Sequence, residues 1–436
     1  MLSAVRRNTE LGLLVLGTLV TVGAYLLASL AEDASIPAGI GPFLAVILGL
    51  QLVAHLAVRR LAPDADGTLL PIAGLLNGLG YVFIVRLDES KADPKGLAGL
   101  QAGWIAVGVV AFVLTLLIVR RVRDLERYRW TIGLVGVVLL LLPLVPGVGK
   151  TINGAKIWVG LGPISFQPGE FAKILLALFF SSYLVEKREL LAVSSHRIGP
   201  IPLPDPKHLG PVLLAWGVSL VVMVAEKDLG SSLLFFALFV ALLWVSTERA
   251  TYLVVGLALF ACGAVFAHSQ FTHVQERVDI WLDPWQDPKD DGFQIVESAF
   301  AFSAGGVTGT GINLGSPTRI PYAETDFIFA AIGEELGLVG ASAVLLAFML
   351  IIGAGLRIAI RTEVPFERLL ATGLTVLIGV QSFIIMAGVI RVLPLTGVTL
   401  PFVSYGGSSL IANYVLLALL LRISDDTAGR ELERAR

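Results

Sequence analysis

The stretch Arg277-Val-Asp-Ile-Trp-Leu-Asp283-Pro284-Trp285-Gln286-Asp287-Pro288 lies within residues 269–325, the one long polar segment in a chain built almost entirely of apolar runs. It is rich in Trp, Asp, Arg and Gln and poor in the Ser, Glu and Lys that mark disordered chain. A loop longer than about 15 residues in a compact protein is usually either functional or disordered. We therefore expect residues 269–325 to be ordered and to carry the chemistry.

The composition on either side of this segment is that of a membrane protein. Of 436 residues, 56% are hydrophobic and 15% are charged, whereas soluble domains carry roughly 25% charged residues. The sequence therefore predicts an all-α polytopic membrane protein. The net charge of −2 gives no reason to expect a nucleic-acid partner.

The apolar runs predict about twelve transmembrane helices, since a span needs about 20 apolar residues. The large loop 269–325 falls between the ninth and the tenth. The pair of spans on either side of Glu226-Lys227-Asp228 also admits a different division. We place the spans at 11–31, 39–58, 69–86, 99–119, 129–146, 168–186, 208–225, 229–246, 250–268, 336–358, 368–390 and 404–422.

The basic residues predict the orientation, because Lys and Arg accumulate in cytoplasmic loops. The clearest cytoplasmic loop is Arg120-Arg121-Val-Arg123-Asp-Leu-Glu-Arg127-Tyr-Arg129. This assignment puts both termini in the cytoplasm and the loop 269–325 outside. Arg6 and Arg7 precede a full-length span with no small-residue cleavage site, so no cleavable signal peptide is expected.

Several classes of site are excluded or disfavoured. Cys262 is the only cysteine, so the chain has no intrachain disulfide and no thiolate metal site. The five histidines show no ligand spacing, and no Ser/His/Asp set suggests a nucleophilic triad. Gly306-Val-Thr-Gly309-Thr-Gly311 has the order GxxGxG rather than the dinucleotide-binding GxGxxG, so we interpret it as tight turns that allow close backbone packing.

Two charged clusters precede apolar helices. Pro168 suits the first turn of a helix on which Glu170 and Lys173 share one face. The pair either satisfies the helix dipole and snorkels, or is functional, because charge entering a bilayer is costly. Asp228 either caps the following helix or lines a cavity together with Lys173.

The long loop holds two equivalent candidates for a general base. Asp283-Pro284 and Asp287-Pro288 are four residues apart and are flanked by Trp281 and Trp285. A carboxylate near apolar rings can act as a base near neutral pH, but Asp-Pro pairs also simply form turns. The spacing does not choose between the two aspartates.

Two further polar clusters follow the loop. The acids Glu334 and Glu335 either cap a helix, pair with Arg277 or Arg319, or hold a cation. The run Pro394 to Ser409 predicts a broken entry to the last span, where Ser404 would cap the helix and amide groups would bind an anion. Since all these clusters fall on the outer side in our topology, they favour a surface site that acts on a lipid-borne substrate.

These segments closely resemble the SEDS family of shape, elongation, division and sporulation proteins, the RodA/FtsW/SpoVE type. The matching segments are Gly154–Trp158, Gln167–Lys173, Asp228-Leu229-Gly230, Arg277–Gln294, Thr325–Ala330, Gly333–Gly337 and Leu400–Ser409. The resemblance implies a peptidoglycan glycosyltransferase that polymerises lipid II in the bacterial cytoplasmic membrane. It also implies a class B penicillin-binding protein as the partner that supplies transpeptidation.

The resemblance also selects residues. It implies Asp287 as the catalytic base. The substrate-binding residues expected are Trp158, Gln167, Glu170, Lys173, Asp228, Arg277, Gln294, Asp326, Ser404, Tyr405 and Ser408. No cofactor is certain, although acids that hold a divalent cation, Mg²⁺ or Mn²⁺, would assist departure of the pyrophosphate.

The resemblance divides the chain into five parts. Members commonly have ten spans, so we expect extra N-terminal spans in 1–65, membrane core in 66–268 and 326–422, the catalytic outer loop in 269–325 and a cytoplasmic tail in 423–436. Lys227 replaces a usual Pro and Gly169 a usual Ser. The segment Gly315–Pro321 lacks a stretch associated with division proteins, which favours the elongation branch. The alternatives are the division branch, a lipid II flippase, and a scaffold that only recruits the partner.

Overall fold

The chain forms two compact units that each draw on distant parts of the sequence. The computed structural model describes residues 2–33, 40–90, 94–152, 154–161, 164–192, 194–198, 201–204, 217–218, 221–222 and 224–434. Unit 1 comprises Met1–Arg120, Asp279–Ala354 and Gln381–Arg436, and unit 2 comprises Arg121–Val278 and Gly355–Val380.

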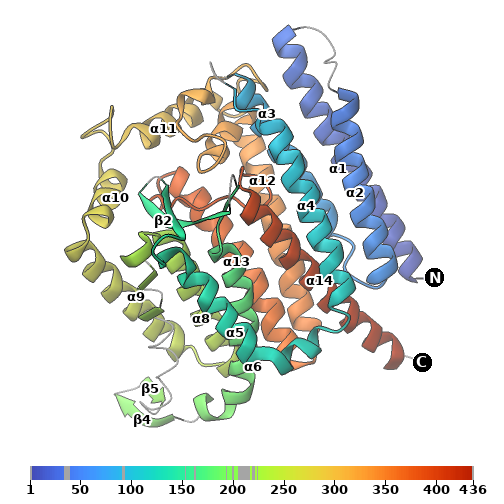
Figure 1. The fold of residues 1–436 in the computed structure, drawn as a ribbon, viewed down its shortest axis with the longest axis vertical. Coiled ribbons are helices and arrows are strands. Elements are labelled where there is room, and N and C mark those ends of the chain that lie inside the picture. The colour runs from blue at the N-terminus through green and yellow to red at the C-terminus, as the bar shows by residue number, and fades with distance from the viewer. Residues whose placement is uncertain are drawn as a thin grey trace. The chain divides into compact units, whose positions relative to one another are not determined.

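Unit 1 is a bundle of long apolar helices. It contains α1 (Leu2–Asp33), α2 (Ile40–Leu61), α3 (Leu69–Glu89), α4 (Leu97–Ile118), α11 (Phe293–Gly305), η4 (Pro317–Arg319), the first part of α12 (Ile328–Arg361), the last part of α13 (Pro365–Val389) and α14 (Gly407–Arg434). Helix α4 packs against α2 and α14, and α1 packs against α3 (Figure 1). Gly108 of α4 allows this approach, because a Cβ there would lie 2.6 Å from the ring of Tyr414.

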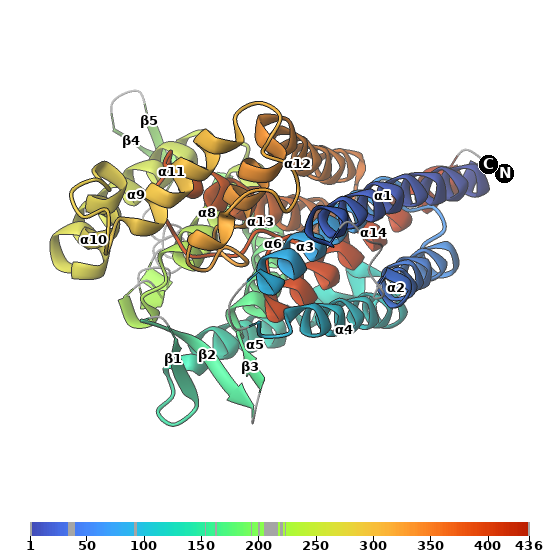
Figure 2. The ribbon, with the colours of Figure 1, turned by 90° about the horizontal axis from the view of Figure 1, so that it is seen from above.

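One end of unit 1 gathers the start of α1 and the later part of α14. Arg7 donates a hydrogen bond to the carbonyl of Ala65. Arg422 donates to the carbonyls of Leu61 and Val119, at the ends of α2 and α4. The two chain ends accordingly lie close together in both views (Figures 1 and 2).

The opposite end of unit 1 holds the segment around residue 315. Asn313 donates to the carbonyl of Ala28, near the end of α1. Arg86, near the end of α3, donates to the carbonyl of Gly315. Residues 313–315 thus lie across the bundle from both termini, as our topology predicts for the outer loop.

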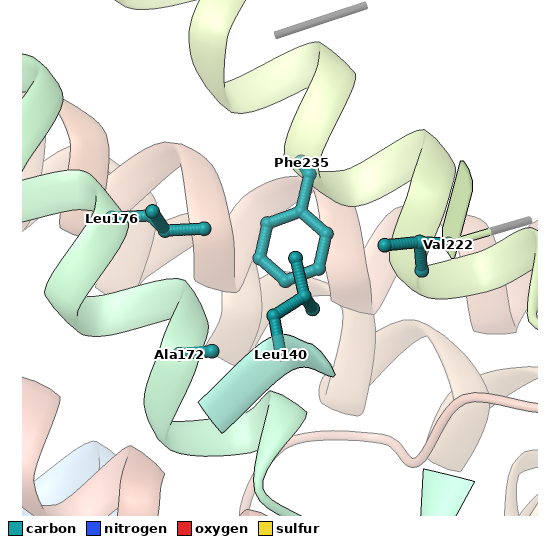
Figure 3. Packing of buried hydrophobic residues seen from close by; sticks show 5 residues of the cluster. All are labelled: Leu140, Ala172, Leu176, Val222 and Phe235. Carbon is teal, nitrogen blue, oxygen red and sulfur yellow. The ribbon is translucent and has the colours of Figure 1, made fainter. Parts of the chain in front are cut away.

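Unit 2 contains the other helices and all the strands that the structure describes. It contains η1 (Val122–Tyr128), α5 (Arg129–Leu141), η2 (Leu142–Leu144), α6 (Gly169–Ala192), α8 (Leu229–Thr247), α9 (Thr251–Gln270), the first part of α10 (Thr272–Leu282), and the remaining parts of α12 and α13. One of its apolar clusters joins α5, α6 and α8 through Leu140, Ala172, Leu176 and Phe235, and also includes Val222 from the described residues 221–222. Figure 3 shows the Phe235 ring over Leu140, between Leu176 and Val222.

Five short strands lie among the residues that the structure describes. β1 (Gly149–Ile152), β2 (Ala155–Leu161) and β3 (Ile164–Phe166) form an antiparallel sheet, and β4 (Ser194–Ile198) pairs with β5 (Ile201–Pro204). Ile152 of β1 pairs with Ala155 of β2, and the sequence between them is Asn-Gly. Asn-Gly is the strongest short-range hairpin signal, so this hairpin was readable in the sequence although we did not predict it.

The prediction of a helical polytopic membrane protein is confirmed. Within the described ranges, nine helices are long and apolar enough to cross a membrane. The count of twelve spans remains a prediction, and the predicted span 208–225 falls largely outside the described residues. The five-part division of the chain also remains a prediction.

The region 269–325 is ordered, as expected, but it is only partly a loop. It contains α10 and α11, and residues 283–292 form turns between these two helices. The last helix, α14, continues through most of the predicted tail 423–436. Helix α12 begins at Ile328 rather than 336, and Gly337 breaks it with φ 65° and ψ −164°.

Candidate functional site

The polar cluster of unit 2 begins at the start of α6. The carbonyl of Pro168 accepts the amides of Phe171 and Ala172, which makes Pro168 the entry to the helix. One turn later the Lys173 ammonium lies 2.5 Å from the Glu170 carboxylate. Glu170 is 8% and Lys173 1% exposed. The predicted pair therefore exists and is buried, where removal of one charge leaves the other uncompensated.

Asp228 caps α8 from the same cluster. Its carboxylate accepts hydrogen bonds from the amide of Ser231 at 3.0 Å and from the Ser231 hydroxyl at 2.5 Å. Burial raises the pKa of Asp228, while the Ser231 hydrogen bonds and the nearby Arg277 oppose this rise. The capping interpretation is confirmed. The mutual influence of Asp228, Arg277 and Glu170 shows that they also share one electrostatic environment.

Two titratable residues of this region were not selected from the sequence. Glu226 is 3% exposed, and burial, together with the neighbouring Asp228, raises its pKa to about 8. Burial and the positive charges of Arg277 and Lys227 lower the pKa of His273. At neutral pH the cluster thus contains a protonated carboxyl and a neutral imidazole. Their sequence signal was only their position beside Asp228 and Arg277.

The backbone conformation at Lys227 explains why the proline of the family pattern is absent at this position. It has φ 56°, in the left-handed region that a long side chain rarely adopts. Proline is fixed near φ −65° and cannot adopt this conformation. The backbone between Glu226 and Asp228 therefore excludes the proline that the family pattern would place there.

Trp158 and Gln167 precede this cluster in the chain. Trp158 is half-buried in β2, where it pairs with Lys150 of β1. Gln167 follows β3, and its carbonyl accepts the amide of Glu170. The sheet therefore leads directly into the helix that carries the Glu170–Lys173 pair.

In unit 1 the two Asp-Pro pairs differ. Asp283 and Asp287 are both exposed. The Asp283 carboxylate accepts the amide of Trp285 at 3.1 Å and so closes an Asx turn. Among the described residues the Asp287 carboxylate has no hydrogen-bond or ion-pair partner. Only its backbone carbonyl is engaged, by the amide of Gly292 at 2.9 Å.

The segment before these aspartates is tied to the end of α13. Arg391 donates to the carbonyls of Trp281 and Leu282 at 2.9 and 2.8 Å, and Trp281 donates back to the Arg391 carbonyl at 3.2 Å. Trp285 packs edge-to-face on Phe300 of α11. Sequence reasoning missed Arg391, because its partners are backbone carbonyls far away in the chain.

Two motifs of unit 1, residues 324–326 and 400–405, are joined by hydrogen bonds. The Ser404 hydroxyl donates to the Thr325 carbonyl at 2.6 Å and accepts the Leu400 amide at 2.9 Å. The Tyr405 amide donates to the Glu324 carbonyl at 2.8 Å. The prediction that Ser404 caps the last helix is wrong, since α14 begins at Gly407 and the Ser404 hydroxyl joins two loops instead.

The remaining predicted residues of unit 1 surround this junction. Tyr405 is half-buried, and burial raises its pKa, although a hydrogen bond with Trp104 opposes this. Ser408 is buried in the first turn of α14, whereas Asp326 and Gln294 are half-buried. Gln294 lies at the start of α11, close in sequence to Asp287. The structure therefore joins the 324–326 and 404–408 segments directly.

Glu334 and Glu335 take a partner that was not predicted. Glu335 is 2.7 Å from Arg86 of α3 rather than paired with Arg277 or Arg319, and both side chains are buried. Glu334 accepts the amide of Ser316 at 2.7 Å. The glycine run docks on this break in α12, because a Cβ at Gly309 would lie 2.1 Å from the Glu335 carbonyl. These contacts support our interpretation of the run as close backbone packing.

Within the part of the chain that the structure describes, no three His, Cys, Asp or Glu side chains are grouped to hold a metal ion. This does not exclude Mg²⁺, which is commonly held by one or two carboxylates and substrate phosphates. The expected divalent cation remains a prediction.

Comparison with known proteins places these features in one group of sequences. A family model described as "Cell cycle protein", for FtsW, RodA and SpoVE, matches residues 67–429. The peptidoglycan glycosyltransferase RodA of Mycobacterium tuberculosis is 47% identical over 424 residues, which cover 96% of this chain and 90% of that protein. The probable peptidoglycan glycosyltransferase FtsW of Geobacter metallireducens is 32% identical over 371 residues, 84% of this chain and 96% of that protein.

Solved structures show the same similarity. A chain from a peptidoglycan synthase complex, studied for the coordination of polymerization and crosslinking, has a TM-score of 0.67 and 29% identity. It matches 83% of this chain and 98% of its own length. The Rod shape determining protein RodA of Thermus thermophilus has a TM-score of 0.58 and 26% identity, with coverages of 83% and 97%.

Proposed function

The chain belongs to the family of cell cycle proteins that comprises FtsW, RodA and SpoVE and is a peptidoglycan glycosyltransferase, and on this basis we propose that it polymerises lipid II with Asp287 as the general base. The reaction takes place at the outer face of the bacterial cytoplasmic membrane and serves cell elongation. The observation that carries the choice of base is the difference between Asp283, whose carboxylate is used in a turn, and Asp287, whose carboxylate is exposed and unengaged.

In this mechanism Asp287 accepts the proton of the acceptor sugar's 4-hydroxyl. The hydroxyl oxygen forms a bond to the anomeric carbon of the donor, and the bond from that carbon to the pyrophosphate oxygen breaks. A general base contributes roughly 10²–10⁴-fold to such a step. An exposed base suits a polymerase, because the acceptor has to reach it from outside the membrane.

The departing pyrophosphate carries negative charge, so cations have to face it. Lys173 and Arg277 are the candidates in unit 2. Lys173 is fixed by Glu170, and Arg277 lies in the field of Asp228. A divalent cation, Mg²⁺ or Mn²⁺, would add to this charge if one or two of these acids held it together with the pyrophosphate.

The other predicted residues divide into two roles. Trp158, Gln167, Gln294, Asp326, Tyr405 and Ser408 are half-buried or lie at helix starts, which suits contact with substrate. Ser404 uses its hydroxyl to join two loops, so we assign it a positioning role. Its replacement would then loosen the junction rather than remove a substrate contact.

We also propose a class B penicillin-binding protein as the partner. Support comes from the matched chain in a peptidoglycan synthase complex that coordinates polymerization and crosslinking. The transpeptidase would crosslink the glycan strands that this chain polymerises. We also propose that both termini of the chain lie in the cytoplasm.

The test is a glycan-chain gel with purified lipid II, with and without the transpeptidase. We expect Asp287→Ala to lower polymer formation by at least about 10²-fold, the lower end of a general base's contribution. The matched control Asp283→Ala removes a carboxylate with the same charge from the same loop and should retain polymerisation. Polymer at the wild-type level from Asp287→Ala would refute the assignment. Equal loss in both variants would show that the loop's shape, rather than a base, was lost.

A further inference from the structure

A basic cavity lies in unit 2, apart from the candidate site, where η1 meets α5. Its volume is ≈ 880 Å³, and its lining includes Arg121, Arg123, Arg127 and Arg129 together with Tyr128 and Trp130. Two acids, Asp124 and Glu126, also line it. The arginines therefore outnumber the acids, and the cavity favours an anionic ligand.

Three of the arginines are available to such a ligand. Arg129 forms an ion pair with Glu186, and its guanidinium lies over the Trp130 ring, 5.7 Å from the ring centroid. Arg121, Arg123 and Arg127 are exposed, and their guanidinium groups have no hydrogen-bond or ion-pair partner among the described residues. Guanidinium groups bind phosphate oxygens with paired N–H donors.

The helix that continues from the cavity offers an apolar surface. Trp130 is 61% exposed, Leu134 65% and Val138 52%. They are four residues apart, so they form one stripe along α5 that starts at the cavity. In a candidate membrane span, Val122–Leu144, such a stripe faces lipid tails, while Trp and Tyr favour the headgroup level.

We propose that this cavity binds the phosphate headgroup of an anionic phospholipid of the cytoplasmic leaflet, whose acyl chains lie along the α5 stripe. Clustered arginines beside a membrane helix attract acidic lipids, and the stripe gives the tails a place that a free phosphate ion cannot use. The site lies in the segment 120–129, which our topology places in the cytoplasm, and it does not depend on the proposed polymerase chemistry.

The experiment is native mass spectrometry of the full-length protein released from detergent micelles, with added phosphatidylglycerol, phosphatidylcholine or inorganic phosphate. Each exposed arginine contributes about 1 kcal/mol, or roughly fivefold in affinity. The triple variant Arg121→Gln/Arg123→Gln/Arg127→Gln should therefore bind phosphatidylglycerol roughly 100-fold more weakly. Its phosphatidylcholine binding should not change.

The matched control is Arg59→Gln/Arg60→Gln/Arg361→Gln. It removes three exposed arginines at the ends of α2 and α12, none of which lines the cavity, and should bind phosphatidylglycerol as the wild type does. The single variant Arg123→Gln should show a loss of roughly fivefold and serves if the triple variant does not fold.

Three results would overturn the proposal. The first is equal retention of phosphatidylglycerol by the wild type, the triple variant and Arg123→Gln. The second is equal affinity of the wild type for phosphatidylglycerol and phosphatidylcholine. The third is inorganic phosphate binding that matches phosphatidylglycerol, which would make the cavity a site for a soluble anion.

Discussion

At the scale of single residues, Glu226 is a carboxyl that folding keeps protonated. Burial and the nearby Asp228 raise its pKa from 4.5 to about 8. Between these two pH values the folded protein holds a proton that the unfolded chain has released. Stability is therefore greatest below about pH 4.5 for this group and falls as the pH rises toward 8.

We expect Glu226→Gln to remove this pH dependence, because the amide is neutral and nearly the same shape. Thermal unfolding in detergent should show that the wild type loses a few degrees more between pH 6 and pH 8.5 than the variant does. The variant should be the more stable of the two at pH 8.5. Parallel melting curves over this range would show that the Glu226 carboxyl is not held protonated.

The two Asp-Pro pairs show where reasoning from sequence stops at this scale. Asp283 and Asp287 are each followed by a proline, so the sequence pattern alone gave them equal weight. The family resemblance selected Asp287. The Asx turn of Asp283 gives an independent physical difference, which the Asp-Pro pattern shared by the two sites does not reveal.

At the scale of elements, a buried ion pair joins α3 to the broken start of α12. Arg86 and Glu335 lie 2.7 Å apart with side-chain exposures of 5% and 0%. Removal of one partner leaves the other charge buried without compensation, which lowers the free energy of unfolding by about 3–5 kcal/mol. We expect Arg86→Met and Glu335→Gln each to lower the unfolding temperature strongly.

The double variant Arg86→Met/Glu335→Gln distinguishes this pair from two independent residues. With both charges gone, neither is left uncompensated, so its unfolding temperature should exceed that of the weaker single variant. Fluorescence-detected size-exclusion chromatography after heating measures the three variants. If the unfolding temperature of the double variant falls by the sum of the two single decreases, the result would contradict a direct ion pair.

Arg391 fixes the end of α10 through hydrogen bonds and thereby also positions the loop that contains Asp287. Its guanidinium bonds the carbonyls of Trp281 and Leu282. We expect Arg391→Ala to lower polymerisation about tenfold while the protein still folds, because the side chain is exposed and a base displaced by about 1 Å loses much of its effect. Arg391→Lys should recover part of the activity, since it restores one donor. Full activity of Arg391→Ala in the glycan-chain gel would remove this role.

The sequence predicted the elements better than their interruptions. The run 69–86 corresponds to α3 (Leu69–Glu89), and 229–246 to α8 (Leu229–Thr247), because a hydrophobic run directly reports the length of a membrane helix. The predicted span 336–358 starts at the break near Gly337 and omits the part of α12 before it, because polar Glu334 and Glu335 interrupt the apolar run. The charge of Glu335 is compensated by Arg86, a partner that only the fold brings close.

At the scale of the whole molecule, the chain ends and the loop that contains Asp287 should face opposite sides of the membrane. Within unit 1, Arg391 lies just past the end of α13 and bonds the segment that leads into the loop. Further along the chain, α14 starts at Gly407. From Gly407 to Glu431, α14 extends about 36 Å at 1.5 Å per residue, enough to cross a hydrocarbon core of about 30 Å. Glu431 should therefore lie on the side opposite to Lys289 of the loop.

The single cysteine makes this orientation testable. Cys262→Ser gives a background without cysteine, to which Lys289→Cys or Glu431→Cys is added, both at exposed positions. In intact spheroplasts a membrane-impermeant maleimide should label Lys289→Cys fully and leave Glu431→Cys unlabelled until the membrane is permeabilised. The opposite pattern would place the Asp287 loop in the cytoplasm, where it could not extend glycan strands in the cell wall. Labelling of both positions in intact cells would refute the single crossing by α14 on which the orientation rests.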